Sequence, residues 1–398
     1  MLKEMVQIEG TITTVSPVHI GSGKMKGTFH PTLDHIPGRT LRGMLGYYLY
    51  KNCDSLKSPL PGKSLFEATG INEQSDLNKI HILFRNAYFE KDSTRFGQTV
   101  CAPLCLQWCK RCDHLVDKNV GICKNTVNNI SCGHEGKKRG GFISWKSFET
   151  GNFLSKTAST TIITKCPIIR KTHTGPGKDD RITPYHIEGL SENQKFGFRM
   201  LVGEQFVDSI KESLINAPVF SGIGGFRSRG YGTVRFDIPG EPRRVEDLIG
   251  TRTEKIKAQF KGDNSGVFTL VANAPMILRK AMADGKPGSS VGFDEVFLQR
   301  ANECLTFIRQ LTGISSGKVS YAGDTPAVSL GRGFARGWSL EKNNTVDEII
   351  PCISAGSTVE VKADPEAIAV LEMFGIGDMT HCGYGQVYCL PPKEVSAI

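Results

Sequence analysis

The chain opens with alternating positions that predict a β-strand. The alternation has a period of two and passes through Val6, Ile8, Gly10, Ile12 and Thr14. Residues at this spacing lie on one face of a pleated strand. A second strand is predicted at 266–278, where the other half of the chain begins.

The hydrophobic spacing then changes to that of an amphipathic helix. Leu41, Met44, Leu45 and Tyr48 follow the i, i+3, i+4, i+7 pattern, directly after the Pro37-Gly38 turn. Further helices are predicted at 203–218, 293–311 and 364–374, whereas 77–90 fits either a strand or a short helix. A strand–loop–strand unit is predicted at 219–236, and a long hairpin at 157–186.

Two Gly-rich loops repeat one pattern 153 residues apart. GIGGFRSRGYGTV begins at residue 222 and GIGDMTHCGYGQV begins at residue 375, each after a helix and before a strand. This distance is too long for a solenoid repeat and indicates a domain duplication. A helix between strands in each half predicts the β-α-β-β-α-β unit. We therefore predict an α+β protein of two tandem ferredoxin-like (RRM-like) domains, with a Cys-rich insert.

The predicted domain bounds follow from these elements. The N-terminal domain spans 1–240 and includes the insert 101–145 and the hairpin 157–186. A linker is predicted at 241–265, because the segment IPGEPRRVED, which begins at Ile238, has two prolines and mixed charges. The C-terminal domain spans 266–398.

Composition narrows the class of protein. Glycine makes up 44 of 398 residues, and 49 basic against 40 acidic residues give a net charge of +9, which suits a polyanionic partner. No apolar run is long enough to span a membrane, and the start lacks the features of a signal peptide. We expect a soluble, cytoplasmic protein whose 12 cysteines are reduced thiols or metal ligands.

Half of these cysteines gather in one short segment. Residues 101–134 hold six cysteines and two histidines, and Cys109 and Cys112 have the spacing of a metal-binding knuckle. Cys123 and Cys132 complete a four-thiolate set, for which Cys101, Cys105, His114 and His134 are the alternatives. Thiolate ligands favour a structural zinc ion, and the other interpretation is a metal-free loop.

The first Gly-rich loop suits contact with phosphate groups. Backbone N–H groups approach a phosphate closely at Gly224 and Gly225, and Arg227 and Arg229 add positive charge. A tight strand connection with solvated arginines explains the same residues. No Walker A phosphate-binding motif occurs.

Candidate catalytic groups lie in other loops. His19 and His173 are candidates for the general base of a metal-independent ribonuclease, and Asp34 is a candidate Mg²⁺ ligand. Asp34 directly precedes the turn that starts a helix, where an acid more often accepts backbone N–H groups. We rank both catalytic interpretations below the structural one.

The motifs together resemble the RAMP superfamily of CRISPR–Cas proteins. The resemblance rests on PVHIGSGK, LDHIPGRTLRGML, GIGGFRSRGYGTVRF and the C-terminal Gly-rich loop. The Cys-rich insert and THTGPGKDDRITPYHIEGL are most similar to the type III-D subunit that caps the 5′ end of crRNA. The resemblance implies a non-catalytic RNA-binding subunit of an effector complex in antiviral defence. It also implies contact with the large signalling subunit and backbone RAMP subunits, and indirect contact with target RNA.

This resemblance implies an RNA-binding surface of loops and hairpin. Phe226 and Tyr231 are candidate stacking faces for unpaired bases. The full set of expected RNA-binding residues is His19, Gly21, Ser22, Gly23, Lys24, Arg39, Arg42, Lys165, Arg170, Lys171, His173, Gly224, Gly225, Phe226, Arg227, Arg229, Gly383 and Gly385.

Three other functions remain open from the sequence. The first is a crRNA-processing endoribonuclease that uses His19 or His173. The second is a backbone slicer, although the slicing branch carries its aspartate further from the IPG turn than Asp34 lies here. The third is an interaction scaffold that docks through the insert.

Overall fold

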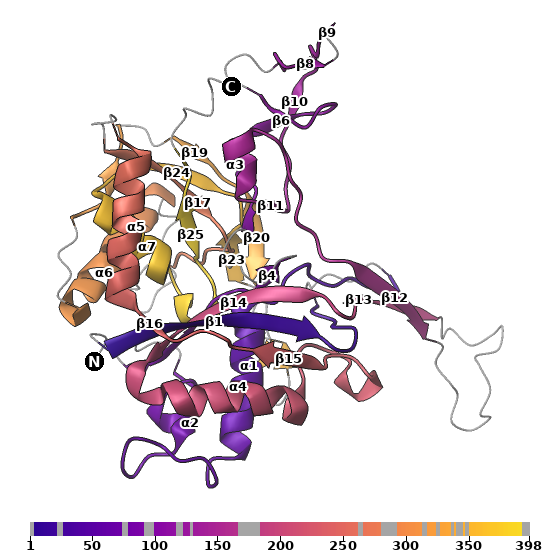
Figure 1. Cartoon of the computed structure of the whole chain (residues 1–398), viewed down its shortest axis with the longest axis vertical. Helices are drawn as coiled ribbons and strands as arrows, with labels where there is room; N and C mark the ends of the chain where they lie inside the picture. Colours follow the sequence, from indigo (N-terminus) through magenta and orange to yellow (C-terminus); the bar gives the residue numbers. More distant parts are fainter. Residues whose placement is uncertain are drawn as a thin grey trace.

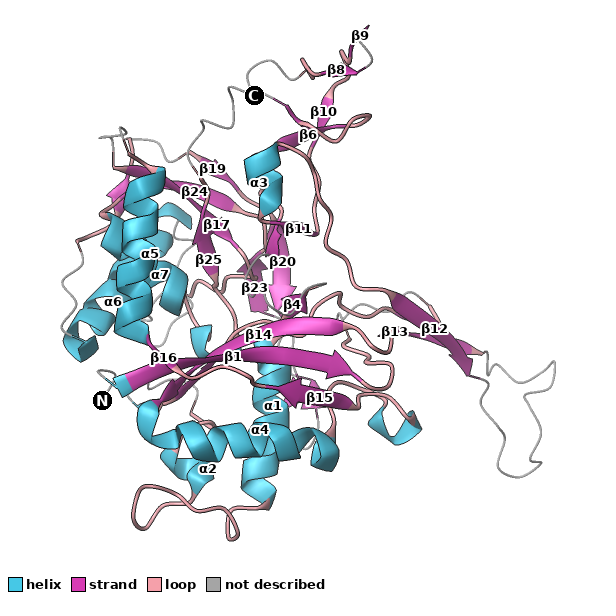
Figure 2. Cartoon of the chain, in the orientation of Figure 1, coloured by secondary structure: helices cyan, strands magenta, loops and turns pink. Residues whose placement is uncertain are grey.

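The computed structural model describes most of the chain as two packed α+β domains. The described residues are 4–21, 27–73, 79–90, 99–116, 122–127, 130–165, 184–261, 266–279, 293–312, 317–323, 327–335, 338–339, 345–346 and 350–391. Figure 1 shows the arrangement of these parts, and Figure 2 shows the same view coloured by secondary structure.

An antiparallel sheet with helices on one face forms the first domain. Its main strands lie in the order β15-β1-β14-β3, and β16 and β4 pair with β1 and β14. These strands are β1 (Met5–Thr14), β3 (Ile82–Phe84), β4 (Tyr88–Phe89), β14 (Lys195–Gly203), β15 (Val234–Asp237) and β16 (Arg243–Arg244). The helices are α1 (Gly38–Lys51), α2 (Leu65–Ala68) and α4 (Val207–Ser221), with a 3-10 turn η3 (Glu204–Phe206) before α4.

The period-two pattern of β1 places one set of residues against these helices. Val6, Ile8 and Ile12 are buried in one core with α1 and α4. Gly10 lies on the same face, where a side chain has no room: a Cβ there would lie 2.8 Å from the Phe198 ring and 2.3 Å from a backbone oxygen. The predicted first strand and first helix are therefore confirmed.

The second domain repeats the topology of the first. Its sheet order is β18-β24-β17-β25, with β19 also paired with β24. The elements are β17 (Val267–Ala272), α6 (Phe293–Thr312), β18 (Ser320–Tyr321), β19 (Val328–Ser329), β24 (Thr358–Lys362), α7 (Pro365–Phe374) and β25 (Val387–Cys389). In both domains the last strand, the first, the third and the second lie side by side in that order, which is the ferredoxin-like arrangement. The predicted fold class is confirmed.

Short strand pairs extend from the two domains. In the insert these are β5 (Thr99–Cys101), β6 (Gln107–Cys109), β7 (Leu115–Val116), β8 (Thr126–Val127), β9 (Ile130–Ser131), β10 (Gly136–Lys137) and β11 (Phe142–Ser144), with helix α3 (Lys146–Thr150). The predicted hairpin consists of β12 (Thr160–Lys165) and β13 (Tyr185–Leu190), and β2 (Phe29–His30) runs parallel to β13. In the second domain β20 (Arg332–Ala335) pairs with β23 (Ile350–Ile353), and β21 (Trp338–Ser339) with β22 (Thr345–Val346).

A second core joins the two domains. Leu83 and Leu201, on the sheet face opposite α1 and α4, are buried together with Phe297 of α6 and Leu371 of α7. The first sheet therefore lies between its own helices and the second domain, as Figure 1 shows.

Two sequence predictions need correction. The prediction of a strand at the start of 219–236 is wrong, because α4 continues through Pro218 to Ser221. The apolar residues that suggested a strand there form the last turn of α4. The predicted linker 241–265 contains a helix, α5 (Val245–Gln259), whose Ile249 and Ile256 are buried in the second core. The stretch 77–90, left open by the sequence, forms β3 and β4 in its described part.

Candidate functional site

The two Gly-rich loops have the same backbone conformation. Five positions in each have positive φ angles, and the sequence offset between the two sets is always 153 residues. The matched pairs are Gly222 with Gly375, Gly224 with Gly377, Phe226 with Met379, Gly230 with Gly383, and Gly232 with Gly385. A short 3-10 turn occupies the centre of each loop, as η4 (Arg227–Arg229) and η5 (Thr380–Cys382). The structure therefore supports the predicted duplication.

Each loop also contacts the chain that follows the first strand of its domain. A Cβ on Gly224 would lie 2.2 Å from the carbonyl oxygen of His19, and one on Gly377 would lie 2.4 Å from that of Ile277. At such distances only glycine fits without movement of the backbone. These glycines are explained by close packing inside each domain.

The second loop is buried between the domains. Gly383 and Gly385 are buried, and a Cβ on Gly383 would lie 2.6 Å from Oδ1 of Asn86 in the first domain. Arg39 donates a hydrogen bond to the Tyr384 hydroxyl (2.6 Å). Arg42 donates to Sγ of Cys382 in the second loop (3.4 Å) and to the carbonyl oxygens of Ile71 and Glu73 in its own domain.

These contacts correct the expected phosphate surface. The structure separates Arg39, Arg42, Gly383 and Gly385 from the exposed first loop and assigns them contacts that hold the domains together. The sequence could not reveal this difference, because both loops share the same glycine spacing.

The first loop is exposed and carries an arginine between two aromatic rings. The guanidinium carbon of Arg229 lies 5.3 Å from the ring centroid of Tyr185 and 5.4 Å from that of Phe226. Its Nη1 atom also donates a hydrogen bond to the Tyr185 hydroxyl. Arg227 is exposed but donates to the carbonyl oxygen of Ser221 (2.7 Å), at the end of α4. Arg229 is therefore held with its charge at the surface.

Histidine rings extend this aromatic group. The Phe226 ring lies 4.9 Å from the His19 ring and 5.5 Å from the His30 ring, centroid to centroid. His19 is buried, and its Nδ1 lies 2.7 Å from the carbonyl oxygen of Glu188 on β13. Burial lowers the pKa of His19 below its ordinary value. Its ring is therefore neutral near pH 7, with Nδ1 donating to Glu188 and Nε2 left as the acceptor nitrogen.

His30 and Tyr185 were missed by sequence analysis. They lie on β2 and β13, which pair although they are far apart in the sequence. A local pattern does not show such a contact. Tyr231, expected as a stacking face, is only 3% exposed and packs inside the domain.

The other expected RNA-binding residues divide into three groups. Gly21, Gly225 and Lys165 lie in described parts of the loop and hairpin, where Gly21 and Gly225 are exposed and Lys165 is half-buried. Ser22, Gly23, Lys24, Arg170, Lys171 and His173 lie outside the described residues. Gly224 is half-buried against His19.

Asp34 pairs with its neighbour. Its Oδ1 lies 3.1 Å from Nδ1 of His35, and the His35 ring packs against Tyr88 and Phe142. The first N–H of α1, on Gly38, is instead bound by Oδ1 of Asn86 (2.9 Å). The expectation that Asp34 satisfies the start of this helix is therefore wrong.

The predicted cysteine set comes together at the end of the insert. The Sγ atoms of Cys109, Cys112, Cys123 and Cys132 all lie within 4.8 Å of one another, and two pairs are separated by 3.5 Å. Cys101, one of the alternatives, is buried elsewhere against Tyr88 and Phe142. Among the described residues this is the only group of three or more side chains that could share a metal ion.

Local turns position the four sulfurs. Asp113 and Gly133 have positive φ angles directly after Cys112 and Cys132, which turns the chain back after each knuckle. Burial opposes ionisation of Cys109, but hydrogen bonds from backbone N–H groups near it lower its pKa to about 6. Burial raises the pKa of Cys123 to about 12. A bound cation is needed for all four to ionise together, because thiolates at these distances repel one another.

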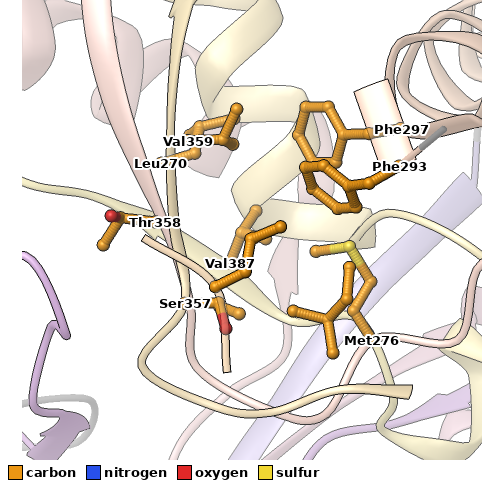
Figure 3. A pocket seen from close by; sticks show the side chains of 11 residues that line it. Leu270, Met276, Phe293, Phe297, Ser357, Thr358, Val359 and Val387 are labelled. Carbon is orange, nitrogen blue, oxygen red and sulfur yellow. The ribbon is translucent and has the colours of Figure 1, made fainter. Parts of the chain in front are cut away.

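Two hollows lie apart from the loop and the cysteine cluster. One is polar, has a volume of about 280 Å³ and is lined by Glu204, Asp208, Lys211 and Arg244. The apolar pocket in Figure 3 lies between the second sheet and α6, and Met276, Phe293 and Val387 line it. Its free volume of about 10 Å³ suits at most one water molecule. In the described part of the chain, no helix is long and apolar enough to cross a membrane.

Comparison with known proteins identifies the family. The RAMP superfamily profile matches residues 11–235, more than half of the chain. The protein belongs to the RAMP superfamily. None of the curated proteins matches it.

Solved structures give weaker likenesses. A chain of the Type III-B Cmr-beta, bound to cognate target RNA, is 15% identical with a TM-score of 0.32, over 61% of this chain and 63% of that chain. The product of a Cas6-related gene from Pyrococcus furiosus is 11% identical with a TM-score of 0.39, over 97% and 98%. A RAMP protein binding different RNA substrates is 10% identical with a TM-score of 0.37, over 96% and 99%. Scores this low carry no argument about function.

Proposed function

We propose that this protein is a non-catalytic RNA-binding subunit of a CRISPR type III-D-like effector complex. Membership in the RAMP superfamily and the net charge of +9 support an RNA ligand. The observation that carries the proposal is the exposed first loop, where Arg229 lies between Phe226 and Tyr185. An ordered arginine beside aromatic faces suits an unpaired strand, because it offers a phosphate contact and stacking surfaces together.

In the proposed complex this surface holds the 5′ tag of crRNA. The predicted hairpin borders the loop, since Tyr185 begins β13, and Lys165 ends the paired strand β12. The chain would join the large signalling subunit to the backbone RAMP subunits and meet target RNA only through the guide.

Substitution of the loop arginines tests this proposal. We expect Arg229→Ala to weaken binding of a tag-containing RNA and to reduce the salt slope by about 0.7, the value for one phosphate contact on a single strand. Arg227→Ala should have a smaller effect, because Arg229 is the loop arginine that lies over the Tyr185 and Phe226 rings, whereas Arg227 binds the Ser221 carbonyl. Arg235→Ala, an exposed arginine of β15, is the matched control. Unchanged affinity and slope in the Arg227/Arg229 double variant would refute the loop assignment.

A ribonuclease is the second candidate, and one observation favours it. The hydrogen bond to Glu188 fixes His19 as a neutral ring with Nε2 as acceptor, the form a general base needs. Incubation of the purified protein with repeat RNA in EDTA tests this function. Specific cleavage that His19→Gln abolishes would replace the non-catalytic proposal. Cleavage of target RNA only with Mg²⁺, lost in Asp34→Asn, would indicate a slicer.

We further propose that the cysteine cluster holds one structural zinc ion. Tetrahedral Zn–S bonds of about 2.3 Å place neighbouring sulfurs about 3.8 Å apart, close to the 3.5 Å observed for two pairs. All four ligands would be protein thiolates, which leaves no position for substrate. The ion would fix the fold of the insert.

A further inference from the structure

The end of the insert projects from both domains. We call residues 107–116, 122–127 and 130–139 the insert tip; it includes β6, β8, β9 and β10, which Figure 1 shows above the two main sheets. Its outer core contains the four clustered cysteines and Val116. At its base, Trp108 packs with Val271 and Tyr388 of the second domain. The outer part of the tip therefore has a small core of its own and is anchored to the second domain at its base.

Most of the charge on the described tip is positive. The cations are Lys110, Arg111, Lys124, Lys137, Lys138 and Arg139, and the acids are Asp113 and Glu135. Lys110 pairs with Glu135 (3.2 Å), and Arg139 pairs with Asp113 and packs on the Phe153 ring. Arg111, Lys124, Lys137 and Lys138 are exposed and form no ion pair with another described residue.

Three of these cations lie next to cysteines of the cluster or opposite the strand that carries one, and Lys138 follows Lys137 in the chain. Arg111 precedes Cys112 and Lys124 follows Cys123, and the sulfurs of these cysteines lie 3.5 Å apart. Lys137 lies opposite Trp108 in the β10–β6 pair, which ends at Cys109. Four thiolates around a divalent ion carry a net charge of −2, but three of them are buried. Solvent therefore meets the lysine and arginine side chains.

The chemistry of this surface favours a phosphate backbone over a protein partner. Protein interfaces are rich in aromatic residues and poor in lysine. Trp108 is fully buried, and among the tip residues whose side chains the structure describes, Ile122 is the only large exposed hydrophobic residue. Clustered lysine and arginine side chains suit phosphate contacts that do not read sequence.

We propose that the insert tip is a second RNA-binding surface, which contacts the phosphate backbone through Arg111, Lys124, Lys137 and Lys138. It is separate from the first Gly-rich loop and does not require that loop to hold the crRNA tag. An RNA longer than the tag would contact both surfaces, whereas a short RNA would need only the loop.

The test compares two full-length variants with the wild-type chain. The tip variant carries Arg111→Ala, Lys124→Ala, Lys137→Ala and Lys138→Ala. The control carries Lys255→Ala on α5, Lys261→Ala just after it, and Lys318→Ala and Lys362→Ala in the second domain. All four lysines are exposed, and the net charge changes equally. Binding of a long oligouridine and of a tag-length RNA is measured across a range of salt concentrations, and zinc content is measured in parallel.

We expect the tip variant to keep its zinc and its affinity for the short RNA. Its salt slope for the long RNA should fall by about 2.8, or about 0.7 for each of the four lost phosphate contacts. When the salt concentration rises from about 50 to 200 mM, the wild type should therefore lose about 50-fold more of its affinity than the tip variant loses. An unchanged slope, or an equal change in the control, would overturn the proposal. So would unchanged RNA binding with loss of a co-purifying subunit, which would assign the tip to a protein partner.

The loop variant separates this inference from the proposed function. The Arg227/Arg229 double variant should lose the short RNA and keep the tip-dependent salt slope for the long RNA. If only the tip variant leaves RNA affinity and salt slope unchanged, the second surface is refuted and the loop proposal stands. If only the loop variant leaves them unchanged, the loop proposal is refuted and the second surface stands.

Discussion

Removal of the proposed zinc should unfold the insert tip and leave the two domains intact. The tip core contains one buried aliphatic residue, Val116, beside the cysteines, and its burial contributes about 1.5–3 kcal/mol. A structural zinc in a small motif supplies about 10–16 kcal/mol at neutral pH. The metal therefore dominates the stability of the cysteine-bearing end of the tip. Trp108, at the base of the tip, is held separately in a core with Val271 and Tyr388 of the second domain.

Cys123→Ser tests this reasoning, because Cys123 is a buried member of the cluster. The wild-type protein should contain about one zinc ion per chain, and the variant should lose it. Limited trypsin digestion should then cut the variant rapidly at Arg111, Lys124 and Lys137, while the thermal unfolding of the two domains changes little. Cys53→Ser, outside the cluster, is the control.

Two results would refute the account of the insert. One is a wild-type protein without bound metal whose tip nevertheless resists trypsin. The other is a Cys123→Ser variant whose whole chain unfolds at a lower temperature, which would mean that the tip supports the domain cores.

Three further predictions concern stability. Arg252→Ala on α5 should lower the free energy of urea unfolding by about 3 kcal/mol, because it removes the only ion-pair partner that the half-buried Glu372 of α7 has among the described residues and leaves it the Cys389 N–H alone. Lys257→Ala, in an exposed pair on the same helix, should change nothing measurable. Burial lowers the pKa of His381 from 6.5 to about 4. The free energy of unfolding should therefore be full above pH 6.5 and should fall by about 3 kcal/mol between pH 6.5 and pH 4. His381→Phe should flatten this pH profile, and a variant profile equal to that of the wild type would contradict the prediction. Gly224→Ala should destabilise the first domain by several kcal/mol more than Gly230→Ala, because both have positive φ but only Gly224 meets a backbone oxygen; equal losses would show that the clash is absorbed.

Local patterns predicted the elements whose stability is mainly local. The period-two strand at β1, the helical spacing of α1 and the Cys109–Cys112 knuckle all appear at the expected residues. The repeated Gly-rich loop also predicted the duplicated topology, because each glycine meets a packing demand inside its own domain.

The missed features depend on contacts between distant segments. α5 lies in a proline-bounded, charged stretch, and it is fixed by burial of Ile249 and Ile256 in the second core. Burial of Gly383 depends on its contact with α1 and Asn86, which the second loop's sequence does not encode locally. Tyr185 and His30 reach Phe226 only after β2 pairs with β13.

The central claim is that the chain holds the 5′ tag of crRNA. The most direct measurement is sequencing of the RNA that co-purifies with the tagged protein from its own host. The account predicts short RNAs that share one constant 5′ end and differ beyond it, and that are lost from the Arg227/Arg229 double variant. Intact or freshly cut repeat RNA without that common end, or no RNA at all, would contradict it.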